Sequence, residues 1–336
     1  MQPTKPKKNI RGKIIGLAIT IVVVLIVWSY SGFISDVATG LFYQPEAEIA
    51  KVIEHIDLTD TGSRILRASR PELQQAASFN RSCPAVSADT STLGCYYQRQ
   101  IFVYDIDNEE LEGIKEAVLA HELLHAVWDR LSDNERKELE PVLRQIYSEN
   151  EADLSEHMSS YEAEDYVDEL HSVIGTQLDA SKLGSRLREH YAKYFNDIDR
   201  IVSYFSAYDE ILTGQRKQAN AMYDEIIALK AEIERRSTAY EQENQKLSND
   251  IDDYNARASH GYTTIAERDA FEAERNQLIT RQNLQQQEYN ALVQLVNSAN
   301  QKVDEYNQLV EHLGELMRSI DSTSVDDIPK AESLSN

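Results

Sequence analysis

The chain has 336 residues and a formal net charge of −23, with 57 acidic against 34 basic side chains. Its length allows two or three units of ordinary domain size. Phosphate contacts require clustered lysine and arginine, so a chain this acidic is not expected to bind nucleic acid.

The N-terminal segment has the pattern of a signal anchor. Residues 1–13 carry only basic charges, and we expect them to form a disordered cytoplasmic tail. Residues 14–34 follow as an apolar run that stays uncharged for about twenty residues, the length that a bilayer core requires. The positive flank precedes this run, which predicts a cytoplasmic N-terminus and an extracytoplasmic body. A cleaved signal peptide is the alternative, but the run is long for one and no A-x-A-like site follows it. The sequence therefore predicts a single-pass protein of the plasma or inner membrane.

Residues 46–212 alternate short helical and extended patterns. Apolar residues recur every three to four positions from 46 to 57, which predicts a helix. We expect a turn at 59–62, a short strand at Ile65–Leu66 and a short helix from Pro71 to Ala77. The segment 98–105 is rich in β-branched and aromatic residues, which gives the best strand signal of the chain.

Two cysteines, Cys83 and Cys95, lie twelve residues apart, and no C-x-x-C motif is present. The missing motif argues against a thiolate zinc site or a thioredoxin-like pair. The spacing suits one disulfide that closes a short loop, and such a bond requires an oxidising compartment. The alternative is a pair of free buried thiols.

The motif His121-Glu122-Leu123-Leu124-His125 lies in a run that is predicted to be helical from about 111 to 131. Positions i and i+4 of a helix share a face, so both imidazoles can converge on one cation. Glu122 then lies beside that cation, where its carboxylate could take a proton from a water that the metal activates. The motif predicts a zinc hydrolase site.

Three more helical segments follow. Ser132 and Glu135 form a capping-box pattern that starts a helix at about 133–147, in which Pro141 is expected to cause a kink. Residues 162–177 keep helical spacing, and 183–208 form an aromatic-rich helical run.

Residues 213–320 show heptad spacing on both sides of a break at 259–264. Such spacing predicts two coiled-coil helices that pair as an antiparallel hairpin. The cleaner series, in the second arm, is Tyr289, Leu292, Val296, Ala299, Val303, Tyr306, Val310, Leu313, Met317 and Ile320. Residues 321–336 are polar and are predicted to be disordered.

The H-E-x-x-H motif and its helical setting resemble those of the zincin metallopeptidases, over about residues 98–180. The metzincin extension is absent, because Trp128 and Leu131 stand where its glycine and third histidine belong. The resemblance is therefore to the gluzincin branch, in which a glutamate on a later helix completes the zinc site. It also implies an edge strand beside the cleft, here Ile101–Tyr104, to which an extended substrate can pair.

Four acids are candidates for the third ligand: Glu149, Glu164, Asp165 and Glu169. We favour Glu169, because it lies among apolar residues of a well-formed helix and a buried carboxylate requires a partner. Glu149 has a gluzincin-like E-x-x-x-D spacing, but its surroundings are polar. His171 would face away from Glu169 on a helix, so we interpret it as a structural histidine.

These patterns predict a mainly α protein with a transmembrane helix, a small α+β zincin-like domain with few strands, and a C-terminal coiled-coil hairpin. The predicted function is hydrolysis of peptide bonds in a peptide or protein substrate, with Zn²⁺ held by His121, His125 and Glu169 and with Glu122 as general base. The hairpin is a candidate surface for a protein partner or for self-association. The alternative is a non-catalytic cell-envelope scaffold with a structural or degenerate zinc module.

Overall fold

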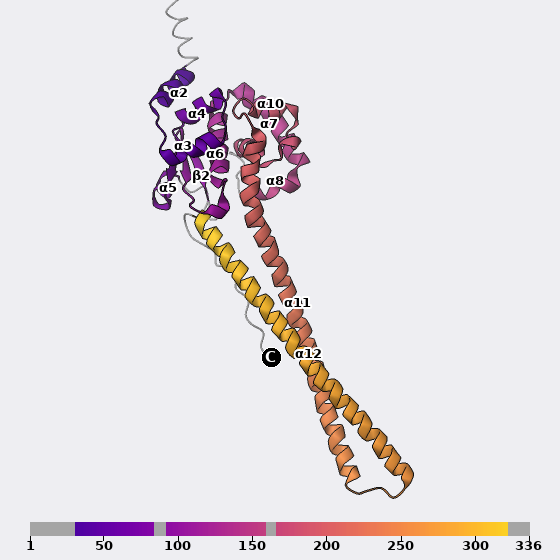
Figure 1. Cartoon of the computed structure of the whole chain (residues 1–336). Helices are drawn as coiled ribbons and strands as arrows, with labels where there is room; N and C mark the ends of the chain where they lie inside the picture. The colour runs from indigo at the N-terminus through magenta and orange to yellow at the C-terminus, as the bar shows by residue number, and fades with distance from the viewer. Residues whose placement is uncertain (1–30, 84–91, 159–165, 322–336) are drawn as a thin grey trace, which may run out of the picture. The chain divides into compact units, whose positions relative to one another are not determined.

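The computed structural model describes residues 31–83, 92–158 and 166–321, which are mainly helical and include one small sheet (Figure 1). The chain forms two compact units. The first contains the described residues up to Ile211 and a short segment from Arg318, and the second is Leu212–Met317. Each unit has its own buried apolar residues.

The first unit contains a three-stranded sheet in the order β1-β3-β2. Strand β1 (Glu72–Gln74) pairs with β3 (Gln100–Tyr104) in parallel, and β2 (Gly94–Tyr97) pairs with β3 in antiparallel. The strand signal at 98–105 is confirmed, but the expectation that Ile101–Tyr104 is an edge strand is wrong. A tight turn with positive φ at Gln98 and Arg99 folds β2 back onto β3, so β3 is central and β2 lies at an edge. Such turns usually contain Asn-Gly, and because that pair is absent here the hairpin could not be predicted from the turn residues.

Helices surround the sheet. They are α2 (Ser31–Phe42), α3 (Ala47–His55), α4 (Asp60–Ala68), α5 (Ala76–Ser82), α6 (Ile114–Arg130), α7 (Asp133–Glu149), α8 (Glu151–Met158), α9 (Tyr166–Gln177) and α10 (Gly184–Tyr191), with 3-10 turns η1 (Glu109–Leu111) and η2 (Ala180–Lys182). The helices predicted at 46–57 and around the H-E-x-x-H motif are confirmed as α3 and α6. The capping box at the start of α7 is also present, and α7 continues through Pro141.

Four local predictions are wrong. The segment 59–62 is not a turn but the start of α4, with Thr59 as its N-cap and Asp60 as its first residue. Ile65–Leu66 is not a strand but part of α4, because Thr59 caps that helix by accepting a hydrogen bond from the Gly62 amide at 3.1 Å. The segment from Pro71 to Ala77 contains β1 and only the start of α5. The run at 183–208 is divided between α10 and α11, and between these helices Phe195 forms a β-bridge with Leu58.

Cys83 and Cys95 are joined by a disulfide in the structure, as the spacing predicted. The bond connects the residue that follows α5 to strand β2. It thereby tethers the edge strand to a neighbouring helix.

Helix α6 is the central element of the first unit. It packs against α9, β2, β3, α3 and α4. Much of it is buried, including Leu119, Ala120, Leu123, Leu124 and Ala126, none of which has exposed surface. Burial on several sides fixes both the position and the rotation of this helix.

Helix α9 approaches α6 closely at Gly175. A Cβ atom at this position would lie 2.5 Å from Leu124 Cδ1 and 2.6 Å from Tyr191 Cε1. Both distances are shorter than any ordinary van der Waals contact, so only glycine fits here without displacing a neighbour. This contact sets the spacing between α6 and α9.

The second unit consists of most of α11 (Ile198–Ala258) and most of α12 (Ile265–Ile320), which form a helical hairpin. Ile226 packs with Val303 and Tyr306, whereas the later residue Ile233 packs with the earlier residues Val296 and Ala299. This reversed order means that the two helices run antiparallel. Ion pairs also join them, including Arg236–Glu288 at 2.8 Å and Arg281–Asp250 at 2.6 Å.

Within residues 31–83, 92–158 and 166–321, no helix is both long and apolar enough to cross a membrane. The predicted span 14–34 lies outside these ranges except for residues 31–34, which belong to α2. The predicted tails at 1–13 and 321–336 also lie outside them, except for Asp321. The anchor and its orientation stay predictions.

Gly175→Ala should lower the free energy of unfolding by about 1–3 kcal/mol, because the added methyl group overpacks the contact between α6 and α9. Urea unfolding followed by circular dichroism measures the change. Gly214→Ala is the matched control, since a Cβ there meets nothing within 4 Å. It lies inside α11 and should stabilise that helix by about 0.5–1 kcal/mol. Equal stability of the two variants would contradict the proposed steric limit.

Candidate metal centre

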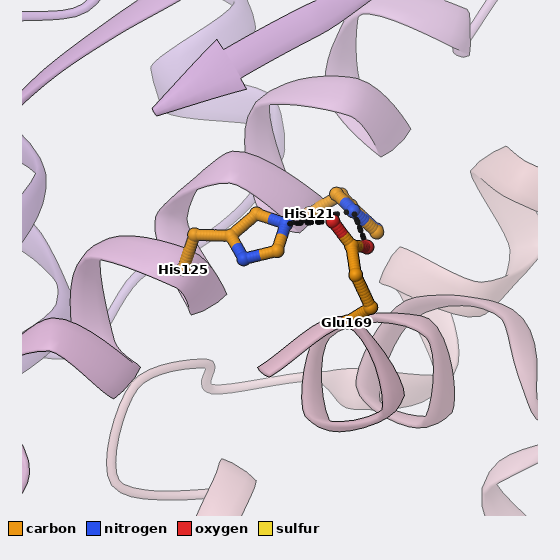
Figure 2. A group of neighbouring side chains, drawn as sticks. All are labelled: His121, His125 and Glu169. Carbon is orange, nitrogen blue, oxygen red and sulfur yellow. Dashed lines mark hydrogen bonds and ion pairs between the residues drawn. The ribbon is translucent and has the colours of Figure 1, made fainter. Parts of the chain in front are cut away.

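Helix α6 presents His121 and His125 on one face, one turn apart (Figure 2). Their Nε2 atoms are 3.1 Å apart, and both side chains are largely buried, with exposures of 15% and 12%. The local i, i+4 spacing of the motif produces this convergence. Two imidazole nitrogens therefore point at the same small volume.

Glu169 approaches both imidazoles from α9 (Figure 2). Its two carboxylate oxygens lie 3.5 Å from His121 Nε2 and 3.5 Å from His125 Nε2. One donor atom from each of the three residues fits within 4.8 Å of the others, so the group could hold a metal ion. It is the one such group of three or more among the described residues.

The other candidates for the third ligand are not found in this group of described residues. Glu149 is exposed near the end of α7 and accepts a hydrogen bond from Gln145, so it does not join the group. Glu164 and Asp165 lie outside the described residues. Among the candidates that the structure describes, Glu169 alone meets both histidines.

Asp168 is a residue that sequence reasoning missed. Its Oδ1 lies 2.9 Å from His125 Nδ1, so that nitrogen can donate its proton to the carboxylate. This tautomer leaves the lone pair on Nε2, the atom that faces Glu169, and a carboxylate behind the ring makes it a stronger ligand. Asp168 directly precedes Glu169, and two adjacent acids on a helix can contact the two nitrogens of one imidazole. This adjacency could have identified Asp168 as a candidate from the sequence.

Negative charge concentrates around the two imidazoles. Burial disfavours protonation of His125, but the hydrogen bond to Asp168 and the charges of Glu169, Asp168 and Glu122 outweigh it and raise the pKa of this histidine to about 10. The surroundings thus favour a positive charge at this point. A bound cation would satisfy the same field.

Glu122 lies beside the group with only 6% of its surface exposed. Burial raises the pKa of this carboxyl, while the neighbouring His125 and His121 lower it. The edge strand β2 passes directly over it at Gly94, where a Cβ would lie 2.9 Å from Glu122 Oε1 and 2.5 Å from Val118 Cγ1. The strand next to the motif carboxylate is therefore β2, not the segment Ile101–Tyr104 that the resemblance implied.

His171 does not join the group. It is fully buried, and its Nε2 lies 2.9 Å from His190 Nε2. Its ring also packs against Trp128 and Tyr191. These contacts agree with the interpretation of His171 as a structural histidine.

The chain matches no family model, no curated protein and no solved structure. The resemblance to zincins therefore depends on the motif and its geometry alone.

Asp168→Ala should weaken zinc binding by about 10–100-fold, because His125 loses the carboxylate that orients its ring. Competition with a chromophoric chelator measures the affinity. Glu149→Ala, an exposed carboxylate outside the group, is the matched control and should bind zinc as the unaltered chain does. Equal affinity in both variants would remove Asp168 from the site.

The pair of His171 and His190 should make stability depend on pH. Burial and then the charge of Lys193 lower the pKa of His190 from 6.5 to about 4. Between these values the unfolded chain binds a proton that the folded chain does not, so stability falls as the pH falls from 6.5 to 4. The loss in free energy of unfolding that is due to His190 over this pH range is on the order of 3 kcal/mol.

His190→Gln keeps a hydrogen-bonding group for His171 but does not titrate. Urea unfolding between pH 4 and pH 7 should therefore show a shallower loss of stability for this variant. His260→Gln removes an exposed histidine from the hairpin loop and serves as the control. The same pH dependence in all three proteins would refute the role of His190.

Proposed function

We propose that this chain is a zinc-dependent metallopeptidase that hydrolyses peptide bonds with Glu122 as general base. One observation carries the proposal: His121, His125 and Glu169 place their donor atoms within 4.8 Å of one another. A separate carboxylate, that of Glu122, is buried beside this group. Metal-ligating atoms next to a poised base are the minimum that metal-assisted hydrolysis requires.

The donor set favours zinc over other cations. Two neutral imidazoles and one carboxylate form the three-ligand set of many catalytic zinc sites, which keep a fourth position for water or substrate. Magnesium and calcium prefer sites made of oxygen atoms alone. When bound, zinc would lower the pKa of a water molecule and polarise the scissile carbonyl.

Glu122 would move the proton. A carboxyl whose pKa is raised by burial is a better base than an exposed one, and the carboxyl of Glu122 is shifted in this direction. It would accept a proton from the attacking water and then donate it to the leaving amine. Its position one residue after His121 on α6 would put it beside the metal-bound water and outside the set of metal ligands.

Strand β2 would position the substrate. Among the described strands it pairs with β3 alone, so its other edge can pair with an extended peptide. Gly94 carries no side chain where β2 crosses Glu122, so the backbone approaches the carboxylate closely. An extended peptide held there would have its carbonyl groups near the proposed metal.

The proposed setting is the extracytoplasmic side of a membrane, with residues 14–34 as the anchor. The Cys83–Cys95 bond supports this setting, because disulfides persist in oxidising compartments. The hairpin in the second unit offers a surface for a protein partner or a second copy.

A non-catalytic envelope scaffold with a structural zinc module is the second candidate. The observation in its favour is the hairpin, whose two long helices have buried clusters and ion pairs of their own. In this case the metal would hold α6 to α9 without turnover.

Glu122→Gln should keep zinc and lose at least about 100-fold in cleavage rate, because the amide cannot accept the proton. Zinc content by elemental analysis and cleavage of a fluorogenic casein measure the two effects on the full chain. Glu116→Gln is the matched control, since Glu116 is also buried on α6 but pairs with His55, at 2.7 Å. It should cleave at the unaltered rate.

The result also separates the two candidates. Cleavage by the Glu122→Gln variant at the unaltered rate would refute the general base. Zinc at one ion per chain with no cleavage by the unaltered protein would favour the scaffold.

A further inference from the structure

Helix α2 is fixed to the first unit by a buried carboxylate. Asp36 has only 5% of its surface exposed. It accepts hydrogen bonds from Arg130 Nε at 2.8 Å, from Arg130 Nη2 at 3.0 Å and from Arg99 Nη2 at 3.2 Å. Charge-assisted bonds of this kind are directional, so they set the rotation of α2 about its own axis.

A second set of contacts holds the other end of α2. The Arg67 guanidinium of α4 donates to the backbone oxygen of Gly40 at 3.1 Å and to that of Tyr43 at 2.9 Å. Gly40 itself is buried against α4, where a Cβ would lie 3.3 Å from Arg67 Cβ. One side of α2 is thus packed against the rest of the first unit.

Another side of α2 is apolar and largely exposed, although the Arg64 guanidinium lies 4.8 Å from the centre of the Phe33 ring. Phe33 and Ile34 are each 52% exposed, Leu41 is 74% exposed and Phe42 is 86% exposed. At 100° per residue these side chains share one half of the helix circumference with Val37 and Ala38. Four large apolar side chains on one short helix form the kind of patch that marks a contact surface.

We propose that this apolar face of α2 lies in the interfacial layer of a lipid bilayer. The sequence directly before it supports lipid as the occupant, since residues 14–30 form an uncharged run with basic residues on its far side. The apolar face of α2 therefore directly follows a segment, residues 14–30, whose composition is typical of a membrane span. Amphipathic helices bury such a face about 5–10 Å into the boundary between headgroups and acyl chains.

This contact would also orient the candidate metal centre. Arg130, the partner of Asp36, is the last residue of α6, the helix that carries His121 and His125. The bilayer, α2 and α6 would then be linked through one ion pair. The inference does not depend on peptidase activity, because it concerns only where the first unit lies.

Tryptophan quenching tests the proposal on the full chain in liposomes that contain dibrominated phosphatidylcholine. Phe42→Trp places a reporter on the apolar face. The chain has two tryptophans of its own, so the emission of the reporter is obtained by subtracting the spectrum of the unaltered chain. We expect this added emission to shift to the blue and to lose most of its intensity to the bromine atoms. Tyr262→Trp, an exposed aromatic position in the hairpin loop, is the matched control and should remain unquenched.

Three results would overturn the proposal. The first is emission from Phe42→Trp that is no more quenched than that from Tyr262→Trp. The second is a blue shift without quenching, which would mean that protein, either a second copy or a partner, covers the face. The third is failure of the chain to float with the liposomes.

Discussion

The close packing of α9 against α6 is the contact on which the candidate centre depends. Gly175 allows the two helices to approach because it has no side chain between Leu124 and Tyr191. The same approach carries Glu169 to within 3.5 Å of each imidazole nitrogen. A larger residue at 175 would separate the helices and move the carboxylate away from the histidines.

The electrostatics of the centre follow from this packing. Asp168 and Glu169 bring two negative charges to a region where α6 already contributes Glu122. Such a concentration of carboxylates, of which Glu122 is buried and the other two are partly buried, is costly unless a proton or a cation offsets it. These carboxylates raise the pKa of His125, so they favour a positive charge on its ring. The group could hold a metal ion, which would match both the charges and the ligand atoms.

The two units are stabilised by different kinds of contact. The first unit buries α6 among a small sheet and several helices, and it also relies on buried polar contacts such as Asp36–Arg130 and His171–His190. The second unit has only a two-helix seam, in which short apolar clusters alternate with ion pairs. A site that requires fixed geometry is therefore found in the first unit, whereas the second offers a long, largely exposed surface.

The sequence by itself determined the features that depend on local geometry. The convergence of His121 and His125, the capping box at Ser132 and the helical hairpin all follow from the fixed rise and period of a helix. Tertiary structure decided the rest: that Glu169 and not Glu149 meets the histidines, that Asp168 supports one of them, and that β2 is the strand beside Glu122. Asp168 and His125 are 43 residues apart, and such contacts depend on how whole elements pack. No local pattern encodes that packing, which is why the neighbouring strand and the supporting carboxylate were not foreseen.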